Sequence, residues 1–204
     1  LKQALQALAY LHKPEHTDPF GCKNMILVHH DLKPSNMLVT EDENGELVLK
    51  LGDFGLSRFT YKNPSSTTYR SGTRGFLAPE TGGDTSVYGP SADIFSWARS
   101  FVVVMSPKCE NLTMLSQIDG DVVENGLPQS LVLSAPLKAL LAKCLSASAE
   151  DNRPSAKLLL EDPYFSNDDE LFQRPPTSTY TDAALLPASS APSATNAGIN
   201  ACEP

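Results

Sequence analysis

The sequence has few cysteines, no long apolar run and no excess of positive charge. Its four cysteines, Cys22, Cys109, Cys144 and Cys202, show no paired spacing that would hold zinc, so reduced thiols without a metal are expected. The longest apolar run, FVVVM at 101–105, is far shorter than a bilayer-spanning segment. The net charge of −8 opposes binding to nucleic acid or anionic membranes. We therefore expect neither nucleic acid nor membrane insertion.

The composition divides the chain into a folded part and a tail. At 204 residues and 41% hydrophobic, the chain can bury one core and has residues to spare. From Gln173 onward it consists mainly of Pro, Ser, Thr and Ala, with Arg174 as the single basic residue. Such a segment buries too little apolar surface to fold. We predict one domain over 1–172 and a disordered tail over 173–204.

The first fifty residues predict a helix followed by short strands. Leucines at helical spacing predict an amphipathic helix over 1–12. Two prolines and a glycine make 12–24 a loop, and a strand over 25–28 follows. Strands over 37–39 and 47–51 are expected to form a hairpin, with a tight turn at Asn44-Gly45.

The remaining elements are mainly helical. We expect a loop over 56–74 and then a helix over 91–105 that is buried on all faces. A poorly patterned stretch over 106–134 should contain a loop and one short helix. A further helix should begin near Pro136 and carry Leu137, Leu140, Leu141 and Leu145, and a last helix, capped by Ser155, should end at Leu160 before Pro163.

Two short motifs carry the chemistry. HHDLKPSNML (29–38) places an acid, a lysine and an asparagine on one loop, and GDFG (52–55) adds a second carboxylate after the hairpin. Phosphoryl transfer needs a base for the hydroxyl proton, a cation near the moving group and oxygen ligands for magnesium. Asp31, Lys33, Asn36 and Asp53 supply these groups in that order.

Three further motifs follow in sequence: SGTRGFLAPE (71–80), SADIFSWA (91–98) and DNRPS (151–155). The ordered set of five resembles the eukaryotic protein kinases of serine/threonine type. The glycine-rich loop, strand lysine and helix glutamate of the kinase small lobe do not occur in the sequence. The resemblance therefore implies an α+β fold, the mostly helical large (C-terminal) lobe, with a small β-hairpin at the catalytic and magnesium loops and the small lobe absent. The lobe is a partial domain over 1–172, with the activation segment at 53–80.

The resemblance assigns roles to the residues of the catalytic loop (29–38) and of the magnesium loop (52–55). It makes Asp31 the base that orients the acceptor hydroxyl. Lys33 would be the cation beside the transferred group, and its presence favours serine/threonine over tyrosine substrates. Asn36 and Asp53 would bind Mg²⁺, and Leu38 would form the floor of the adenine site.

The other residues that the resemblance singles out support the site. They are His29, Phe54 and Gly55 in the two loops, Thr73 as the partner of the catalytic lysine, Glu80 and Arg153 as a buried ion pair that holds the activation segment, and Asp93 as the acid that accepts backbone amides of the catalytic loop. Phe54 is expected to pack beneath a small-lobe helix.

The function implied is transfer of the γ-phosphoryl group of Mg-ATP to a serine or threonine of a protein substrate, in the cytoplasm, with the chain inactive by itself. A pseudokinase or truncated homologue that acts as a binding module remains an alternative. A small-molecule phosphotransferase of kinase-like fold fits Lys33, Glu80 and Arg153 poorly, and a helical scaffold unrelated to kinases fits the motifs less well still.

The sequence departs from the kinase pattern at His30, where many kinases carry an arginine that pairs with an activation-loop phosphate. A histidine is only partly charged near pH 7 and lacks the guanidinium fork. We hypothesise that activity depends weakly, or not at all, on phosphorylation of residues 65–69. Phe76, Phe95 and Ala98 replace Tyr, Trp and Gly, and are expected to be tolerated packing changes.

Overall fold

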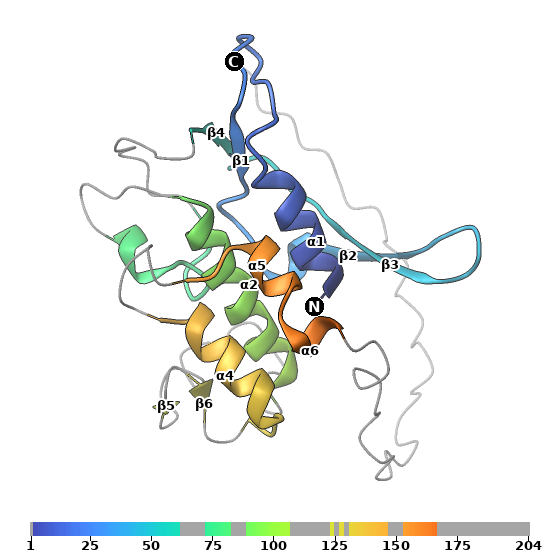
Figure 1. The fold of residues 1–204 in the computed structure, drawn as a ribbon, viewed down its shortest axis with the longest axis vertical. Coiled ribbons are helices and arrows are strands. Elements are labelled where there is room, and N and C mark those ends of the chain that lie inside the picture. The colour runs from blue at the N-terminus through green and yellow to red at the C-terminus, as the bar shows by residue number, and fades with distance from the viewer. Residues whose placement is uncertain are drawn as a thin grey trace, which may run out of the picture. The chain divides into compact units, whose positions relative to one another are not determined.

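A single long helix, α2 (Pro90–Met105), forms the centre of the folded part, with the other helices packed around it (Figure 1). The structure is a computed structural model. It describes residues 2–61, 72–82, 89–106, 123–124, 127–128, 131–146 and 153–166. All of these belong to one compact unit, Leu1–Leu171. The predicted tail, 173–204, lies outside the described residues.

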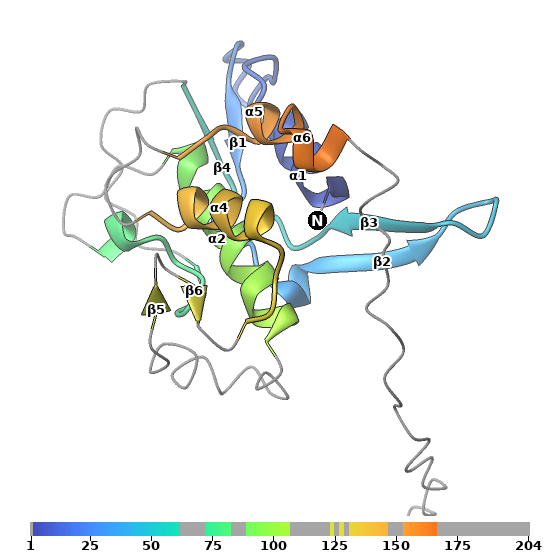
Figure 2. The same ribbon diagram turned by 60° about the horizontal axis from the view of Figure 1, so that its bottom comes forward.

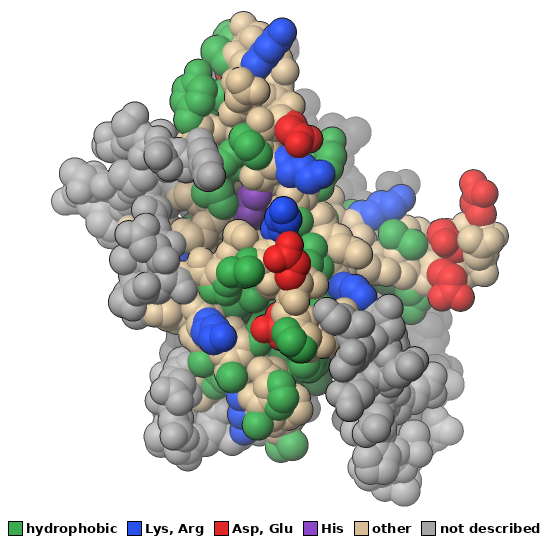
Figure 3. Space-filling view, viewed as in Figure 1, with side chains coloured by type: hydrophobic (Ala, Val, Ile, Leu, Met, Phe, Trp, Pro, Cys, Tyr) green, Lys and Arg blue, Asp and Glu red, His purple; other side chains and the backbone are tan. Residues whose placement is uncertain are grey.

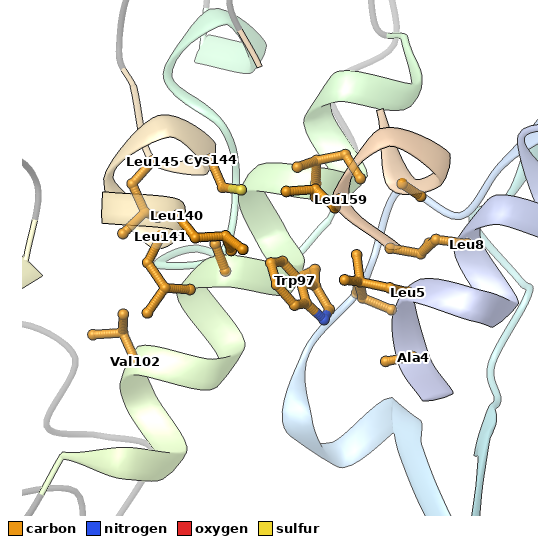
Figure 4. Close-up of a cluster of buried hydrophobic side chains, with 14 of the residues drawn as sticks. Ala4, Leu5, Leu8, Trp97, Val102, Leu140, Leu141, Cys144, Leu145 and Leu159 are labelled. Atoms are coloured by element: carbon orange, nitrogen blue, oxygen red, sulfur yellow. The ribbon is translucent and has the colours of Figure 1, made fainter. Parts of the chain in front are cut away.

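Helix α2 is apolar on most of its faces, which explains its central position. Ile94, Trp97, Ala98, Val102 and Val103 are each at most 2% exposed. Trp97 lies between Leu5 and Leu8 of α1 (Lys2–Leu11) on one side and Leu140 and Leu141 of α4 (Ala135–Cys144) on the other (Figure 4). The predicted helix is confirmed, but its burial on all faces is not, because Phe95, Arg99 and Phe101 are only partly buried and the last turn is exposed.

Helix α1 (Lys2–Leu11) packs one apolar stripe against this core, as its leucine spacing predicted. Ala4, Leu5, Leu8 and Leu11 are the buried members of the stripe. The predicted loop follows, closed by a single bridge between His16 and Met25. It leads into strand β1 (Ile26–Val28).

The expected loop over 56–74 contains a strand that the sequence did not indicate. Strand β4 (Arg58–Thr60) pairs antiparallel with β1, Leu27 opposite Phe59. A three-residue strand is too short to show a period of two, and only its partner, about thirty residues earlier in the chain, stabilises it. Residues 62–71 lie outside the described part.

Strands β2 (Met37–Glu41) and β3 (Leu47–Leu51) form the predicted hairpin, with β2 two residues longer than expected. The connection is a five-residue loop in which Gly45 has φ +80°. The Asp42 side chain accepts the backbone N–H groups of Asn44 and Glu46. Acidic side chains gather at the tip of this hairpin, which projects from the body of the protein (Figure 3).

Short elements complete the described part. They are the 3-10 helices η1 (Pro34–Asn36) and η2 (Pro79–Gly82), the paired strands β5 (Val123–Glu124) and β6 (Leu127–Pro128), and the helices α4 (Ala135–Cys144), α5 (Ala156–Leu160) and α6 (Pro163–Ser166).

The helices at the end of the domain largely follow the sequence. Pro136 lies in the first turn of α4, and the Ser155 side chain caps α5 by accepting Leu158 N–H at 3.2 Å. The predicted last helix, α5, is followed by another, because α6 begins at Pro163. A proline cannot continue the interior of a helix, but its fixed φ suits the first turn of a new one. Within the described residues, no helix has the length and apolarity to cross a bilayer. Most of the stretch over 106–134 lies outside the description.

Candidate functional site

Three polar side chains at the start of η1 form a closed triangle of hydrogen bonds. Lys33 Nζ donates to Asp31 Oδ2 at 2.7 Å and to Thr73 Oγ1 at 2.7 Å. The Thr73 hydroxyl in turn donates to Asp31 Oδ1 at 2.7 Å. Thr73 lies 42 residues after Asp31, so the fold, and not the local chain, brings the group together.

The carboxylate of Asp31 is held in its charged form. Asp31 is only 6% exposed, and burial by itself would raise its pKa. The hydrogen bonds from Lys33, Thr73 and Asn36, with the positive charge of Lys33, outweigh burial and lower the pKa below its ordinary value. At neutral pH Asp31 is therefore an ionised acceptor, able to orient a hydroxyl group and to take its proton late in a reaction.

Asn36 is fixed in orientation by the same loop. Its side-chain Nδ2 donates to the backbone oxygen of Asp31 at 2.8 Å and to Asp31 Oδ2 at 3.3 Å. Because the amide nitrogen is engaged in this way, the amide oxygen is the atom that could bind a metal ion. The residue is 7% exposed and ends the 3-10 helix that begins at Pro34.

A buried acid on α2 supports the backbone just before Asp31. Asp93, 1% exposed, accepts the N–H of His29 at 2.8 Å and that of His30 at 3.0 Å. It also contacts His12 Nε2 at 3.0 Å. Burial would raise the pKa of Asp93, but the bonds from His12 and the two amides lower it. The His30 backbone needs this support, since its φ of +66° is costly for a residue other than glycine.

His29 links the catalytic loop to the segment after β3. Its Nε2 lies 3.0 Å from the backbone oxygen of Gly52, and its Nδ1 accepts Asp31 N–H at 3.3 Å. These partners place the ring proton on Nε2. The His29 ring also packs against Phe54, with centroids 5.0 Å apart. Phe54 remains 44% exposed, so His29 covers only one part of the ring.

Asp53 lies two residues after the end of β3 and is exposed, with φ +59°. Gly52 N–H donates to Asn36 O at 2.9 Å, which ties the end of the hairpin to the start of β2. Gly55 N–H approaches Asp53 Oδ1 at 3.4 Å. Leu38, expected beside the adenine ring, is 56% exposed on β2.

The oxygen donors fit magnesium better than a transition metal. The carboxylate of Asp53 and the amide oxygen of Asn36 are hard ligands, and Mg²⁺ uses few protein ligands because it keeps water and phosphate oxygens. In the part of the chain that the structure describes, no cluster of three or more His, Cys, Asp or Glu side chains could hold a metal. The donor set thus suits an ion that arrives with phosphates.

The expected ion pair between Glu80 and Arg153 is present. The guanidinium group binds both carboxylate oxygens, Nη1 to Oε1 and Nη2 to Oε2, the latter at 2.9 Å. It also donates to the backbone oxygen of Ser146, and it lies 5.0 Å from the ring centroid of Phe95. Arg153 is 6% exposed, so it fastens the segment after Thr73 to the helical body.

The sequence did not single out three residues that support this site. His12 contacts Asp93, as described above, and Ser57 Oγ donates to His29 O at 3.1 Å. Gly72 has φ +123°, and a Cβ there would lie 2.6 Å from His30 O. The sequence around His12 and Gly72 does not indicate these contacts, because their partners are distant in the chain.

Comparison with known proteins identifies the family. The profile of the protein kinase domain matches residues 1–165. Serine/threonine-protein kinase Nek6 of Oryza sativa subsp. japonica is 32% identical over 164 residues, which cover 79% of this chain and 27% of that protein. Probable serine/threonine-protein kinase WNK4 of Arabidopsis thaliana is 31% identical over 173 residues, 82% of this chain and 27% of that protein. Cyclin-dependent kinase F-4 of Oryza sativa subsp. japonica is 30% identical over 144 residues, 67% and 28% respectively.

The chain thus spans little more than a quarter of the length of these curated relatives. The profile match covers well over half of the chain, and it includes each of the residues Asp31, Lys33, Asn36, Asp53, Thr73 and Arg153. The chain belongs to the protein kinase family.

Proposed function

We propose that the chain is the large lobe of a serine/threonine protein kinase and contributes to transfer of the γ-phosphoryl group of Mg-ATP to a protein hydroxyl. The observation that carries the proposal is the triangle of Asp31, Lys33 and Thr73, in which an ionised carboxylate is held beside a cation. A solvated turn aspartate would not need a partly buried lysine and a threonine from a segment 42 residues away.

Each residue has a defined task in this proposal. Asp31 accepts a hydrogen bond from the acceptor hydroxyl, orients its oxygen and takes up its proton. Lys33 places positive charge beside the transferred group, and Thr73 keeps both side chains in position. Asn36 and Asp53 would hold Mg²⁺, which when bound neutralises phosphate charge. Leu38 offers an exposed apolar surface for the adenine ring.

Serine/threonine specificity has two supports. Lys33 occupies the position two residues after Asp31 where tyrosine kinases generally lack a lysine. Two of the relatives, Nek6 and WNK4, are themselves named as serine/threonine-protein kinases.

Regulation at His30 can be proposed in more detail. Its pKa is lowered, chiefly by burial and further by the nearby Arg58 and His29, although Asp93 opposes the shift. At neutral pH the ring is then uncharged and offers no cation to a phosphate. Residues 65–69 lie outside the described part. Replacing Ser65, Ser66, Thr67, Thr68 and Tyr69 together with Ala should leave activity in place, and its abolition would contradict the hypothesis.

The proposed function is tested by removing a metal ligand in the full-length protein. Asp53→Ala should reduce phosphoryl transfer from ATP to background, because the remaining donor, Asn36, is neutral. Glu43→Ala, at an exposed acid in the hairpin loop, is the matched control and should leave transfer unchanged. Asp31→Asn should lower the rate by roughly 10²–10⁴-fold. A wild-type protein that binds partners but transfers no phosphoryl group would favour the binding-module alternative, and activity retained in Asp53→Ala would refute the role of Asp53.

A further inference from the structure

The side chain of Gln3 bonds to the backbone of β3 through both ends of its amide. Nε2 donates to Leu47 O at 3.1 Å, and Oε1 accepts Leu49 N–H at 2.7 Å. Both groups belong to the edge of β3 that faces away from β2. Gln3 lies on the first turn of α1, and that end of the helix runs beside β3 (Figure 2).

This pair of bonds reproduces the pattern of a neighbouring strand. In a parallel ladder, one residue donates to the carbonyl before its partner and accepts from the N–H after it. The Gln3 amide does this around Val48, the residue between its two partners. A side chain from a helix therefore satisfies backbone groups that an edge strand otherwise leaves to solvent.

The strand held in this way leads to Asp53. Only Lys50, Leu51 and Gly52 separate Leu49 from Asp53. Gly52 is itself held by Asn36 O and the His29 ring, so β3 and these two bonds together set the position of the carboxylate. Most side chains of β2 are exposed, and the described apolar anchorage of the hairpin consists of Met37, Leu49 and Leu51, which are partly buried against the core. The two hydrogen bonds from Gln3 add to this packing in the first half of β3, where Leu47 is exposed.

Helix α1 also supports the other half of the site. His12, just beyond its last turn, contacts Asp93, which holds the backbone before Asp31. The C-terminal end of α1 is thus linked to the catalytic loop through Asp93 of α2, and its first turn is linked through Gln3 to β3, which leads to Asp53. Its stripe of buried residues in the core keeps those two attachments at a fixed spacing.

We propose that Gln3 is a positioning residue for Asp53. It fixes β3 on α1, so that the Asp53 carboxylate is presented beside Asn36 for a divalent metal ion. This inference rests on the proposed function, because it assigns Asp53 to the metal. Gln3 touches neither metal nor nucleotide in this scheme and acts only through the strand.

The matched variants are Gln3→Ala and Gln6→Ala in the full-length protein. Both residues are exposed on α1, but no side-chain hydrogen bond of Gln6 is found among the described residues, so its variant controls for helix propensity and lost polarity. Gln3→Glu keeps the acceptor for Leu49 N–H and loses the donor to Leu47 O. It should give an intermediate effect.

Two readouts separate positioning from simple support. Amide hydrogen exchange at Leu49 should rise roughly fivefold in Gln3→Ala, as expected for loss of one ordinary hydrogen bond. Titration with Mn²⁺ in the presence of a non-hydrolysable ATP analogue, followed by electron paramagnetic resonance, should show metal affinity weakened by a similar factor. Gln6→Ala should change neither value.

The outcomes are distinct. Unchanged Leu49 exchange in Gln3→Ala would show that the amide does not clamp β3, and faster exchange with unchanged metal affinity would show that the clamp does not position Asp53. Either result overturns the proposal, as does a wild-type protein that binds no Mn²⁺. If the wild type binds metal but transfers no phosphoryl group, the proposed function fails while the two readouts still decide the role of Gln3.

Discussion

The catalytic loop and the β2–β3 hairpin lie next to each other in the chain but are built in opposite ways. In the loop, His29, Asp31 and Asn36 are 0%, 6% and 7% exposed, and each has partners within the protein. On the hairpin, Val39 and Leu47 are 62% and 63% exposed. The loop therefore holds its polar side chains in place through contacts within the protein, whereas the hairpin exposes apolar side chains to solvent.

The difference shows how each region is held in its conformation. Buried polar groups are costly unless they are hydrogen-bonded, so the loop is determined by a network in which any missing member leaves another unsatisfied. The hairpin is held by its ladder, by the packing of Met37, Leu49 and Leu51 on the core and by its attachment to α1, so substitution of its exposed side chains should change stability little. Substitutions in the two regions should accordingly differ in size.

The largest effect is expected from removing the acid beneath the loop. Asp93→Ala leaves two backbone amides and His12 without their acceptor in a buried position. Removing one partner of such a buried network should lower the free energy of unfolding by about 3–5 kcal/mol. Urea unfolding of the variant and the wild type measures it. A loss no greater than that of an exposed substitution would show that Asp93 does not hold the loop.

A smaller effect is expected from adding one methyl group before Thr73. In Gly72→Ala the new Cβ would meet His30 O at 2.6 Å at a φ of +123°, which should cost about 2–4 kcal/mol of unfolding free energy. Gly45→Ala in the hairpin loop also has positive φ but open space around it, and should cost about 1 kcal/mol. Thermal and urea unfolding of the two variants compare them directly, and equal losses would remove the distinction between the regions.

The next effect concerns pH. The folded-state pKa of His30 is below its ordinary value, so between the two values the unfolded chain binds more protons than the folded protein. The stability it contributes is present above about pH 6.5 and is lost as the pH falls through the folded-state pKa. His30→Asn, which tolerates positive φ, should flatten the fall in unfolding free energy between pH 7 and pH 5.5.

The carboxylates of Asp31 and Asp93 titrate below the pH range of this measurement. The lowered pKa values of Asp31 and Asp93 make their contributions present above about pH 4 and lost only below it. An unchanged pH dependence in His30→Asn would mean that His30 is not the titrating group.

The smallest effect is expected on the hairpin surface. Val39→Thr keeps a β-branched side chain on an exposed strand and should change the free energy of unfolding by no more than about 0.5 kcal/mol. The same exchange at Val28, 0% exposed in β1, buries a hydroxyl group and should cost about 1–3 kcal/mol. Urea unfolding of both variants provides the comparison, and a large loss at Val39 would show that the hairpin is anchored by this face.

Much of the local structure could be predicted because its signals lie within a few residues of each other. The leucine stripe predicted α1, the continuous apolar run predicted α2, and Ser155 marked the start of α5. Strand β4 could not be predicted, since its three residues are a strand only through pairing with β1. The burial of α2 was overestimated along one face and at its end, because an apolar composition does not show which parts of a helix other segments cover.

The sequence by itself determined the chemistry available: which side chains could serve as base, cation and metal ligands, and in what order along the chain. Only the tertiary structure decided what holds them. Thr73 reaches Asp31, His12 reaches Asp93 and Gln3 reaches β3 across 42, 81 and 46 residues respectively. Such contacts leave no periodic trace in the sequence, because hydrogen bonds between distant residues exist only once burial of the core has brought the backbone segments together.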